Sequence, residues 1–308
     1  MANGIVYVGS LDHHLYAFDT RTGKELWSSH TSEDVMSSPA VARGVVYVDS
    51  RYGDLRAFDA QNGAELWHED IGFDCYSSPA VVRGVVYVGG CDGNLYAFNA
   101  RNGMRVWTAT TGDVAVDSSP AVAHGVVFTA AQDDELFAFR ASDGRQLWSA
   151  SVDQGCCTTP ESSPAVANGI VYVGSNDDDL YAFKASDGEL LWSESTGDYV
   201  ESSPAVVAGV VYVGSLDDHL YAFSATTGRR LWSAPTGSSI DSSPAVANGV
   251  VYVGSWDHRL YAFDAETGRK LWSARTGWSI ESSPAVAHGA VYITSVDGNL
   301  YAYRRARR

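Results

Sequence analysis

The chain alternates between short apolar runs and clusters of Gly, Pro, Asp and Ser, and this pattern recurs with a fixed period. The phrase Gly-(Ile/Val/Ala)-Val-(Tyr/Phe) occurs repeatedly, at spacings of 40, 40, 41, 44, 40, 40 and 40 residues. Apolar residues alternate with polar ones or form short runs without helical periodicity, which predicts β-strands throughout. Each repeat is then one small supersecondary unit. The repeats begin at Gly4, Gly44, Gly84, Gly125, Gly169, Gly209, Gly249 and Gly289.

Each repeat predicts four short antiparallel strands, which we call A, B, C and D. Strand A is the segment Ser-Ser-Pro-Ala-Val, whose proline stands at the start, where its missing N–H breaks no ladder. A turn such as Ala247-Asn248-Gly249 leads to strand B, and a turn such as Asp92-Gly93, typical of a type I′ hairpin, leads to strand C. Strand D follows a Thr-Gly or Asn-Gly turn and carries a tryptophan, at Trp27, Trp67, Trp107, Trp148, Trp192, Trp232 and Trp272.

A four-stranded antiparallel unit of this length with one large aromatic residue is typical of a β-propeller blade. Radial stacking buries both faces of each small sheet against its neighbours, which no blade achieves alone. The repeated tryptophans would supply the largest apolar contact between blades, and each indole N–H needs a partner. We therefore predict an all-β chain that forms a single propeller domain over residues 1–308.

The strand C to strand D segment resembles a known repeat. Ala262 to Trp272 has the pattern A-F-D-A-x-T-G-R-K-L-W, with copies at Ala17 to Trp27 and Ala222 to Trp232. This pattern resembles the tryptophan-docking motif of the PQQ-like, quinoprotein-type and BamB-like propeller repeat, and the resemblance covers essentially the whole chain. It implies eight blades. The family includes quinone-dependent alcohol dehydrogenases, the outer-membrane assembly lipoprotein BamB and many cell-surface proteins.

The number of blades follows from counting strands. The repeats supply seven A, eight B, eight C and seven D strands, because the chain opens at strand B and ends on strand C at Tyr303. We favour eight blades with incomplete terminal blades. The alternative is seven blades, closed by the strand of Trp27 pairing onto the C-terminal sheet. Unpaired terminal strands would also permit self-association between molecules.

Charge narrows the classes of partner. The formal net charge is −16, with 37 Asp and Glu against 21 Lys and Arg, which argues against a nucleic-acid partner. The carboxylates are mostly Asp and the cations almost all Arg, a balance similar to that of proteins from salt-loving archaea. We find no apolar run long enough to be a transmembrane segment and no basic n-region of a signal peptide. The family resemblance favours an extracytoplasmic or cell-surface location.

Hairpin topology places the B–C turns and the D–A crossovers on one face, which we call the crossover face. Sequence differences between repeats concentrate there, and binding residues usually lie on loops of a rigid scaffold. Aromatic residues dominate binding hot spots. The candidate anchors are Phe73, Tyr76, Tyr199, Trp256 and Trp278.

Acidic residues immediately precede strand A in five consecutive repeats. Because inner strands start near the channel mouth, these carboxylates would form an arc able to hold a hard cation such as calcium. The structural alternative is that each accepts backbone N–H bonds in its crossover. The arc consists of Asp117, Glu161, Glu201, Asp241 and Glu281.

The four cysteines also lie on the crossover face. Cys156 and Cys157 are adjacent, and this dipeptide resembles the adjacent-cysteine disulfide that lies against the quinone in some PQQ-dependent dehydrogenases; the alternative is a pair of buried thiols. Pairing of strands A and B around Arg83 brings Cys75 and Cys91 within bridging range, which predicts a disulfide, with two reduced thiols as the alternative.

The remaining residues favour no catalytic centre. The Asp residues of the B–C turns are interpreted as turn formers, the serine pairs lack a histidine in register, and no phosphate-binding glycine loop is present. We predict a non-enzymatic, BamB-like scaffold for protein–protein interaction, from a halophile and without a cofactor. One alternative is a dehydrogenase-like propeller that depends on PQQ or a metal. The other is a purely structural repeat array or fragment without a ligand.

Overall fold

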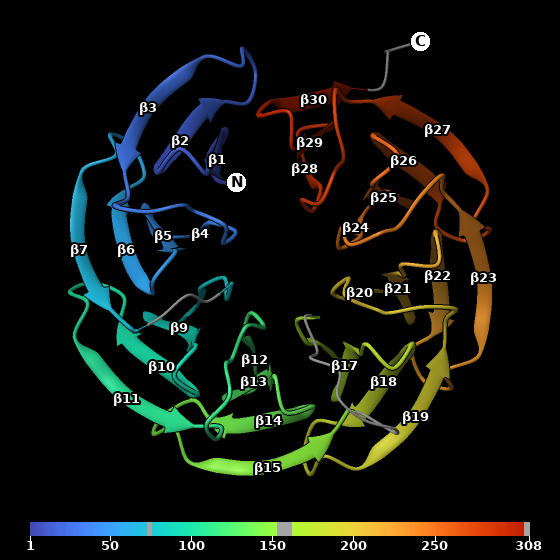
Figure 1. The fold of residues 1–308 in the computed structure, drawn as a ribbon, viewed down its shortest axis with the longest axis horizontal. Helices are drawn as coiled ribbons and strands as arrows, with labels where there is room; N and C mark the ends of the chain where they lie inside the picture. Colours follow the sequence, from blue (N-terminus) through green and yellow to red (C-terminus); the bar gives the residue numbers. More distant parts are fainter. Residues whose placement is uncertain (73–75, 153–161, 305–308) are drawn as a thin grey trace. The chain divides into compact units, whose positions relative to one another are not determined.

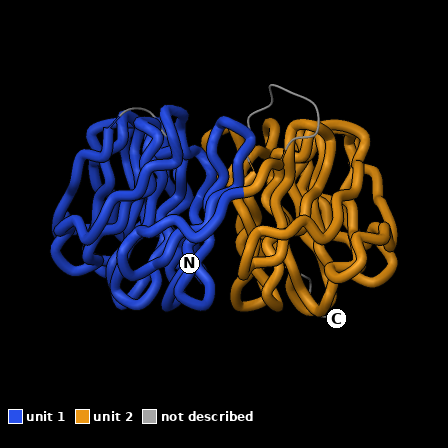
Figure 2. Tube along the Cα trace, turned by 90° about the horizontal axis from the view of Figure 1, so that it is seen from below, with its two compact units in different colours: residues 1–149 blue, residues 150–308 orange. Residues whose placement is uncertain are grey.

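The computed structural model describes residues 1–72, 76–152 and 162–304. These residues form thirty β-strands and no helix. The chain divides into two compact units, residues 1–149 and 150–308, which Figure 2 shows in blue and orange. The strands belong to eight antiparallel blades of the β-propeller type, four associated with each unit (Figure 1).

The first unit contains blades 1 to 4, and the last strand of blade 4 ends just beyond the boundary. Blade 1 has three strands and the others have four. The strands are β1 (Ile5–Gly9), β2 (His14–Asp19), β3 (Glu25–His30), β4 (Ala40–Ala42), β5 (Val45–Ser50), β6 (Asp54–Asp59), β7 (Glu65–Asp70), β8 (Ala80–Val82), β9 (Val85–Gly90), β10 (Asn94–Asn99), β11 (Arg105–Thr110), β12 (Ala121–Ala123), β13 (Val126–Ala131), β14 (Glu135–Arg140) and β15 (Gln146–Ser151).

The second unit contains blades 5 to 8, and here blade 8 has three strands. The strands are β16 (Ala165–Ala167), β17 (Ile170–Gly174), β18 (Asp179–Lys184), β19 (Leu190–Ser195), β20 (Ala205–Val207), β21 (Val210–Gly214), β22 (His219–Ser224), β23 (Arg230–Pro235), β24 (Ala245–Ala247), β25 (Val250–Ser255), β26 (Arg259–Asp264), β27 (Lys270–Arg275), β28 (Ala285–Ala287), β29 (Ala290–Thr294) and β30 (Leu300–Arg304).

The predicted all-β propeller with eight blades and incomplete terminal blades is confirmed. The seven-bladed alternative is wrong, because β3, the strand of Trp27, pairs with β2 of its own blade and not with the C-terminal sheet. The single domain over residues 1–308 stays a prediction.

Strand A is shorter than predicted. Each A strand contains three residues and begins after the proline, as in β20 (Ala205–Val207). The two serines before the proline do not belong to the strand and form hydrogen bonds within and between blades. Ser202 accepts a hydrogen bond from the N–H of Gly214 in its own blade at 3.1 Å, and its hydroxyl donates to the carbonyl of Ser242 in the next blade at 3.2 Å. The hydroxyl of Ser203 accepts the N–H of Ser163 at 2.9 Å. The serine pairs therefore connect the inner strands of consecutive blades.

Replacing Ser202 by Ala should lower the free energy of unfolding by about 1–3 kcal/mol. The substitution leaves a buried backbone N–H and a buried carbonyl without their partner, and such groups cost the full desolvation penalty. Urea unfolding at fixed salt measures the change. The exposed Ser233 offers a matched control, and Ser233→Ala should change stability little. An equal effect of the two substitutions would show that the hydroxyl network contributes nothing.

The type I′ geometry occurs at the A–B turns and not at the B–C turn for which it was predicted. At the A–B turns, two consecutive residues have positive φ, for example Asn248 at 51° and Gly249 at 73°, as a type I′ turn requires. The type I′ prediction for Asp92-Gly93 is wrong. Gly90 pairs with Asn94, so this loop has three residues, and only its last, Gly93, has a positive φ, of 76°. That geometry fits a three-residue hairpin loop.

The tryptophans of strand D lie at contacts between consecutive blades. In the first unit, the Trp107 indole N–H donates to the carbonyl of Ala141 in blade 4 at 3.0 Å, and the Tyr87 hydroxyl donates to the same oxygen at 3.2 Å. The two rings lie 5.7 Å apart. A Cβ on Gly144 would lie 2.7 Å from Trp107 Cε3, so the turn of blade 4 needs glycine there. The same carbonyl contact joins Trp27 to Ala60, Trp67 to Ala100, Trp192 to Ala225 and Trp232 to Ala265.

Candidate interaction surface

Backbone hydrogen bonds tie the B–C turns to the D–A crossovers. In the second unit, Leu216 N–H donates to the carbonyl of Tyr199 at 3.0 Å, and Trp256 N–H donates to that of Ser239 at 3.1 Å. Val296 N–H donates to the carbonyl of Ser279 at 3.1 Å. The two kinds of loop therefore share one face, as the hairpin topology predicts.

The aromatic candidates of the second unit are exposed on this face. Trp278 is 60% exposed and Trp256 is 43% exposed. The ring of Trp278 stacks on His258, with centroids 6.4 Å apart and planes at 18°. Because Trp256 and His258 belong to the same B–C turn, the two indoles lie on neighbouring loops. Tyr199 is 42% exposed, on the crossover between blades 5 and 6. We call Tyr199, Trp256, His258 and Trp278 the aromatic surface.

A threonine in the crossover holds Trp278 in place. The Thr276 hydroxyl lies 2.7 Å from the carbonyl of Trp278 and 3.2 Å from that of His258, and its N–H donates to the carbonyl of His258 at 3.0 Å. The hydroxyl of Ser295 in blade 8 donates to the carbonyl of Trp278 at 3.1 Å. Residues of two blades thus fix the backbone beneath the exposed indole. A partner that binds here would therefore lose little free energy in ordering this loop.

The surroundings of the aromatic surface are strongly acidic. The B–C turns at 175–178, 215–218, 255–258 and 295–298 and the crossovers at 196–204, 236–244 and 276–284 contain ten Asp and Glu residues, one His and neither Lys nor Arg. Burial raises the pKa of Asp178, and the carboxylates of Asp198 and Asp177 raise it further. This face therefore carries a negative potential.

Some of these carboxylates stabilise the B–C turns in which they lie. The Tyr221 hydroxyl donates to Asp217 Oδ2 at 2.5 Å, while Asp217 Oδ1 accepts the N–H of His219 at 3.0 Å. Burial and this hydrogen bond raise the pKa of Tyr221. Tyr261 and Asp257 form the same contact in blade 7. The aspartates of the B–C turns thus hold their own hairpins, as turn formers do.

Several of the other sequence candidates lie outside the described residues. Tyr76 is exposed in the first unit, whereas Phe73 lies outside the described residues. Glu161, Cys156, Cys157 and Cys75 also lie outside them. Cys91 is disulfide-bonded, and Ala80 pairs with Tyr87 as the register argument requires. The pairing of Cys91 with Cys75 stays a prediction.

The described acidic residues before strand A differ in their contacts and burial. Asp117 accepts a hydrogen bond from the Gln132 amide and lies 3.4 Å from Cys91 Sγ, and burial raises the pKa of its carboxyl. Asp241 Oδ1 is buried and has no hydrogen-bond partner in the described structure. The Ser279 hydroxyl donates to Glu281 Oε1 at 3.4 Å. Within residues 1–72, 76–152 and 162–304, no three His, Cys, Asp or Glu side chains are placed to hold a metal ion. The cation arc, including Glu201, stays a prediction.

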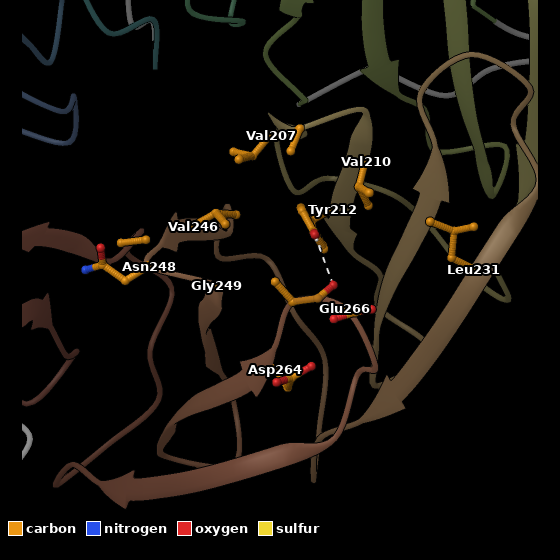
Figure 3. A pocket seen from close by; sticks show the side chains of 12 residues that line it. Val207, Val210, Tyr212, Leu231, Val246, Asn248, Gly249, Asp264 and Glu266 are labelled. Atoms are coloured by element: carbon orange, nitrogen blue, oxygen red, sulfur yellow. Dashed lines mark hydrogen bonds between the residues drawn. The ribbon is translucent and has the colours of Figure 1, made fainter.

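A groove opens on the opposite face, where sequence reasoning placed no site. It has a volume of 630 Å³ and lies between blades 6 and 7 (Figure 3). Val207, Val246 and Leu231 supply apolar lining, and Asp264 and Glu266 supply carboxylates. One sequence feature could have indicated this groove. Blade 6 has Val-Ala at positions 207–208, whereas the equivalent positions of blades 5 and 7 have Ala-Asn.

The described residues include no helix long and apolar enough to cross a membrane. No curated protein sequence is significantly similar to this chain. Solved structures are similar over nearly all of it. BamB from Moraxella catarrhalis has a TM-score of 0.84 at 18% identity, covering 99% of this chain and 95% of that chain. Sqt1 from Saccharomyces cerevisiae has a TM-score of 0.85 at 14% identity, covering 99% and 94%.

A europium-containing methanol dehydrogenase is also similar, with a TM-score of 0.81 at 16% identity, over 98% of this chain and 81% of that chain. At such identities the likeness shows the fold alone. The family model described as outer membrane protein assembly factor BamB matches residues 1–113, 158–241 and 220–307, which is most of the chain. The chain therefore belongs to the BamB family of PQQ-like β-propellers.

Proposed function

We propose that this protein is a non-enzymatic scaffold that binds another protein through the aromatic surface of its second unit. The observation that carries the proposal is the exposure of Trp278 and Trp256 on neighbouring, well-anchored loops. Exposed apolar side chains that lie together mark interaction sites, and Trp and Tyr dominate binding hot spots. The surrounding carboxylates favour a partner that presents positive charge.

Comparative capture from an extract of the native host tests this proposal. The immobilised chain, its Trp278→Ala variant and a Leu66→Ala variant would be compared by quantitative mass spectrometry. Leu66 is a matched control because it is an exposed apolar residue on strand D of blade 2. A partner should be retained by the chain and by Leu66→Ala, and reduced at least about tenfold by Trp278→Ala, since a hot-spot side chain contributes about 2 kcal/mol or more.

The same experiment decides against the proposal if every retained protein is unaffected by Trp278→Ala. That result would favour a structural repeat array without a ligand. A partner, once identified, should bind more weakly as salt concentration rises, because its attraction to this acidic face is screened.

A dehydrogenase-like function is the second candidate, favoured by the similarity to methanol dehydrogenase. Cys156 and Cys157 would lie nearest the quinone by family resemblance, and calcium would bind at the carboxylates before strand A. The described residues do not form such a metal site. Titration with PQQ and calcium, followed by absorbance and tryptophan fluorescence, tests this function; saturable binding of both would favour it over the scaffold.

A further inference from the structure

The groove between blades 6 and 7 opens at an A–B turn whose sequence differs from the others. The first of its two residues with positive φ is Ala208, at 51°. Asn and His adopt this conformation more readily than most residues, whereas Ala has no polar group to support it. A residue that fits its backbone conformation less well is often retained where it serves a site. The equivalent residues of the other repeats are all larger and polar: Asn3, Arg43, Arg83, His124, Asn168, Asn248 and His288.

The residue before Ala208 is an exposed valine. Val207 is the last residue of β20 and is 43% exposed. Val82, the one other valine at this position, is half-buried, and the remaining repeats have alanine. Val207 lines the groove together with Val246 and with Leu231, which is 40% exposed (Figure 3). A longer side chain at position 208, as in the other turns, would fill space at this end of the groove, so the small Ala208 leaves apolar surface accessible.

Two carboxylates line the groove from blade 7. Asp264 is the last residue of β26, and Glu266 lies in the C–D turn that follows and is exposed. Thr267 donates to Asp264 Oδ1 from its N–H at 2.9 Å and from its hydroxyl at 2.8 Å. These hydrogen bonds hold the pKa of Asp264 below its usual range, so its carboxyl group is negatively charged at neutral pH.

This pair of acids occurs at one contact between blades and not at the others. The described lining of the groove contains neither Lys nor Arg, although Arg269 in the same turn attracts Asp264 from outside the lining. Apolar surface and negative charge are therefore combined here. The equivalent pairs of the other repeats are Asp19 and Arg21, Asp59 and Gln61, Asn99 and Arg101, Arg140 and Ser142, Lys184 and Ser186, Ser224 and Thr226, and Arg304 and Ala306.

We propose that this groove binds a small organic cation, namely a protonated amine attached to an apolar body. The volume of 630 Å³ lies in the range of small-molecule sites, which combine apolar lining with a few polar groups. The apolar body would contact Val207 and Val246, and the ammonium group would pair with the carboxylates of Asp264 and Glu266. An anionic ligand would be repelled. Because the groove and the aromatic surface lie on opposite faces, the two proposals stand or fall independently.

Titration with phenethylamine, which is protonated at neutral pH, tests the proposal on the full chain with isotope-labelled valine and leucine methyl groups. By NMR we expect saturable shifts of the methyl signals of Val207, Val246 and Leu231, which line the groove. Phenethyl alcohol keeps the apolar body without the charge, and it should bind at least about tenfold more weakly because the charge-assisted contact is lost. Hydrocinnamate, which carries a carboxylate instead, should not bind.

Three protein variants locate the site. Glu266→Gln removes one charge at nearly constant size and should weaken phenethylamine binding at least about tenfold. The double variant Val207→Ala/Ala208→Asn gives blade 6 the turn sequence of blades 5 and 7, which this chain already folds. It should weaken binding by at least the same factor without lowering the melting temperature, since Asn suits the positive φ. The matched control is Asp198→Asn, which removes an exposed carboxylate from the crossover face and should leave binding unchanged.

The outcomes separate a built site from general attraction of a cation to an acidic protein. The proposal is overturned if phenethylamine produces no saturable shift at the groove, or if phenethyl alcohol binds as tightly as phenethylamine. It is also overturned if the double variant binds like the unmodified chain. An equal loss of binding in Asp198→Asn and Glu266→Gln would show non-specific attraction and would likewise decide against it.

Discussion

Replacing Trp107 by Ala should lower the free energy of unfolding by about 3–5 kcal/mol, the usual cost of removing a buried large aromatic side chain. Trp107 is only 8% exposed, and its ring fills the space between Tyr87 and Gly144. Its N–H donates to the Ala141 carbonyl. The substitution therefore removes apolar contact, leaves a cavity and weakens the seam between blades 3 and 4 at once.

Urea unfolding at fixed salt and pH measures this effect. Trp278→Ala is the matched control, because it removes the same side chain from an exposed position and should change stability by no more than about 0.5 kcal/mol. Trp107→Phe should fall between the two, since it keeps an aromatic ring and loses the N–H. A cost for Trp107→Ala no larger than that of Trp278→Ala would contradict the role of these tryptophans in joining blades.

The periodic part of the fold could be predicted because every repeat carries the same sequence pattern. Gly249, Trp272 and their copies occur in register, so the strands follow from spacing, whereas the family resemblance and the intact strands B and C of the end repeats favoured eight blades over seven. The type of each turn was harder to predict from the sequence. The dipeptide Asp92-Gly93 is compatible with several hairpin loops, and the pairing of Gly90 with Asn94 decides among them. The role of the serine pairs also depends on contacts with the next blade, which a single repeat does not reveal.

The candidate sites could be predicted only in part, because they lie where repeats differ. Comparison of repeats identified Trp256 and Trp278 as departures from the pattern, and both are exposed. It did not identify the exposure of Ala302, since that residue is identical to its copies and differs only in that no strand D of the described residues lies beside it. It also passed over Asp49, a departure at a position that is glycine in five blades, at Gly9, Gly89, Gly174, Gly214 and Gly254.

Asp49 is a buried carboxyl group on β5. Its side chain is almost completely buried, and within the described structure neither carboxylate oxygen has a hydrogen-bond partner. In blade 1, a Cβ on the equivalent Gly9 would lie 2.4 Å from Val35 Cγ1, which shows that this position faces the interior side of the crossover. Burial raises the pKa of Asp49 well above its usual range, and the carboxylate of Asp54 raises it further.

The raised pKa makes stability depend on pH. Below the pKa of an unfolded Asp, about 3.9, the group is protonated in both states and contributes no pH dependence. Above that pH the unfolded chain releases the proton while the folded chain keeps it, so stability falls as pH rises, by up to about 1.4 kcal/mol per pH unit, until the pKa of the folded state is passed.

Asp49→Asn should remove this dependence while keeping the size of the side chain. The variant should differ little from the unmodified chain near pH 4 and become more stable at neutral pH, by more than about 1 kcal/mol, because the loss accumulates across the pH range between the two pKa values. Urea unfolding at several pH values and constant ionic strength measures the difference. The control is Asp113→Asn, which makes the same substitution at an exposed position and should change stability by no more than about 0.5 kcal/mol. Parallel pH profiles for the unmodified chain and Asp49→Asn would mean that Asp49 ionises in the folded state as it does in the unfolded chain, and that its burial carries no electrostatic cost.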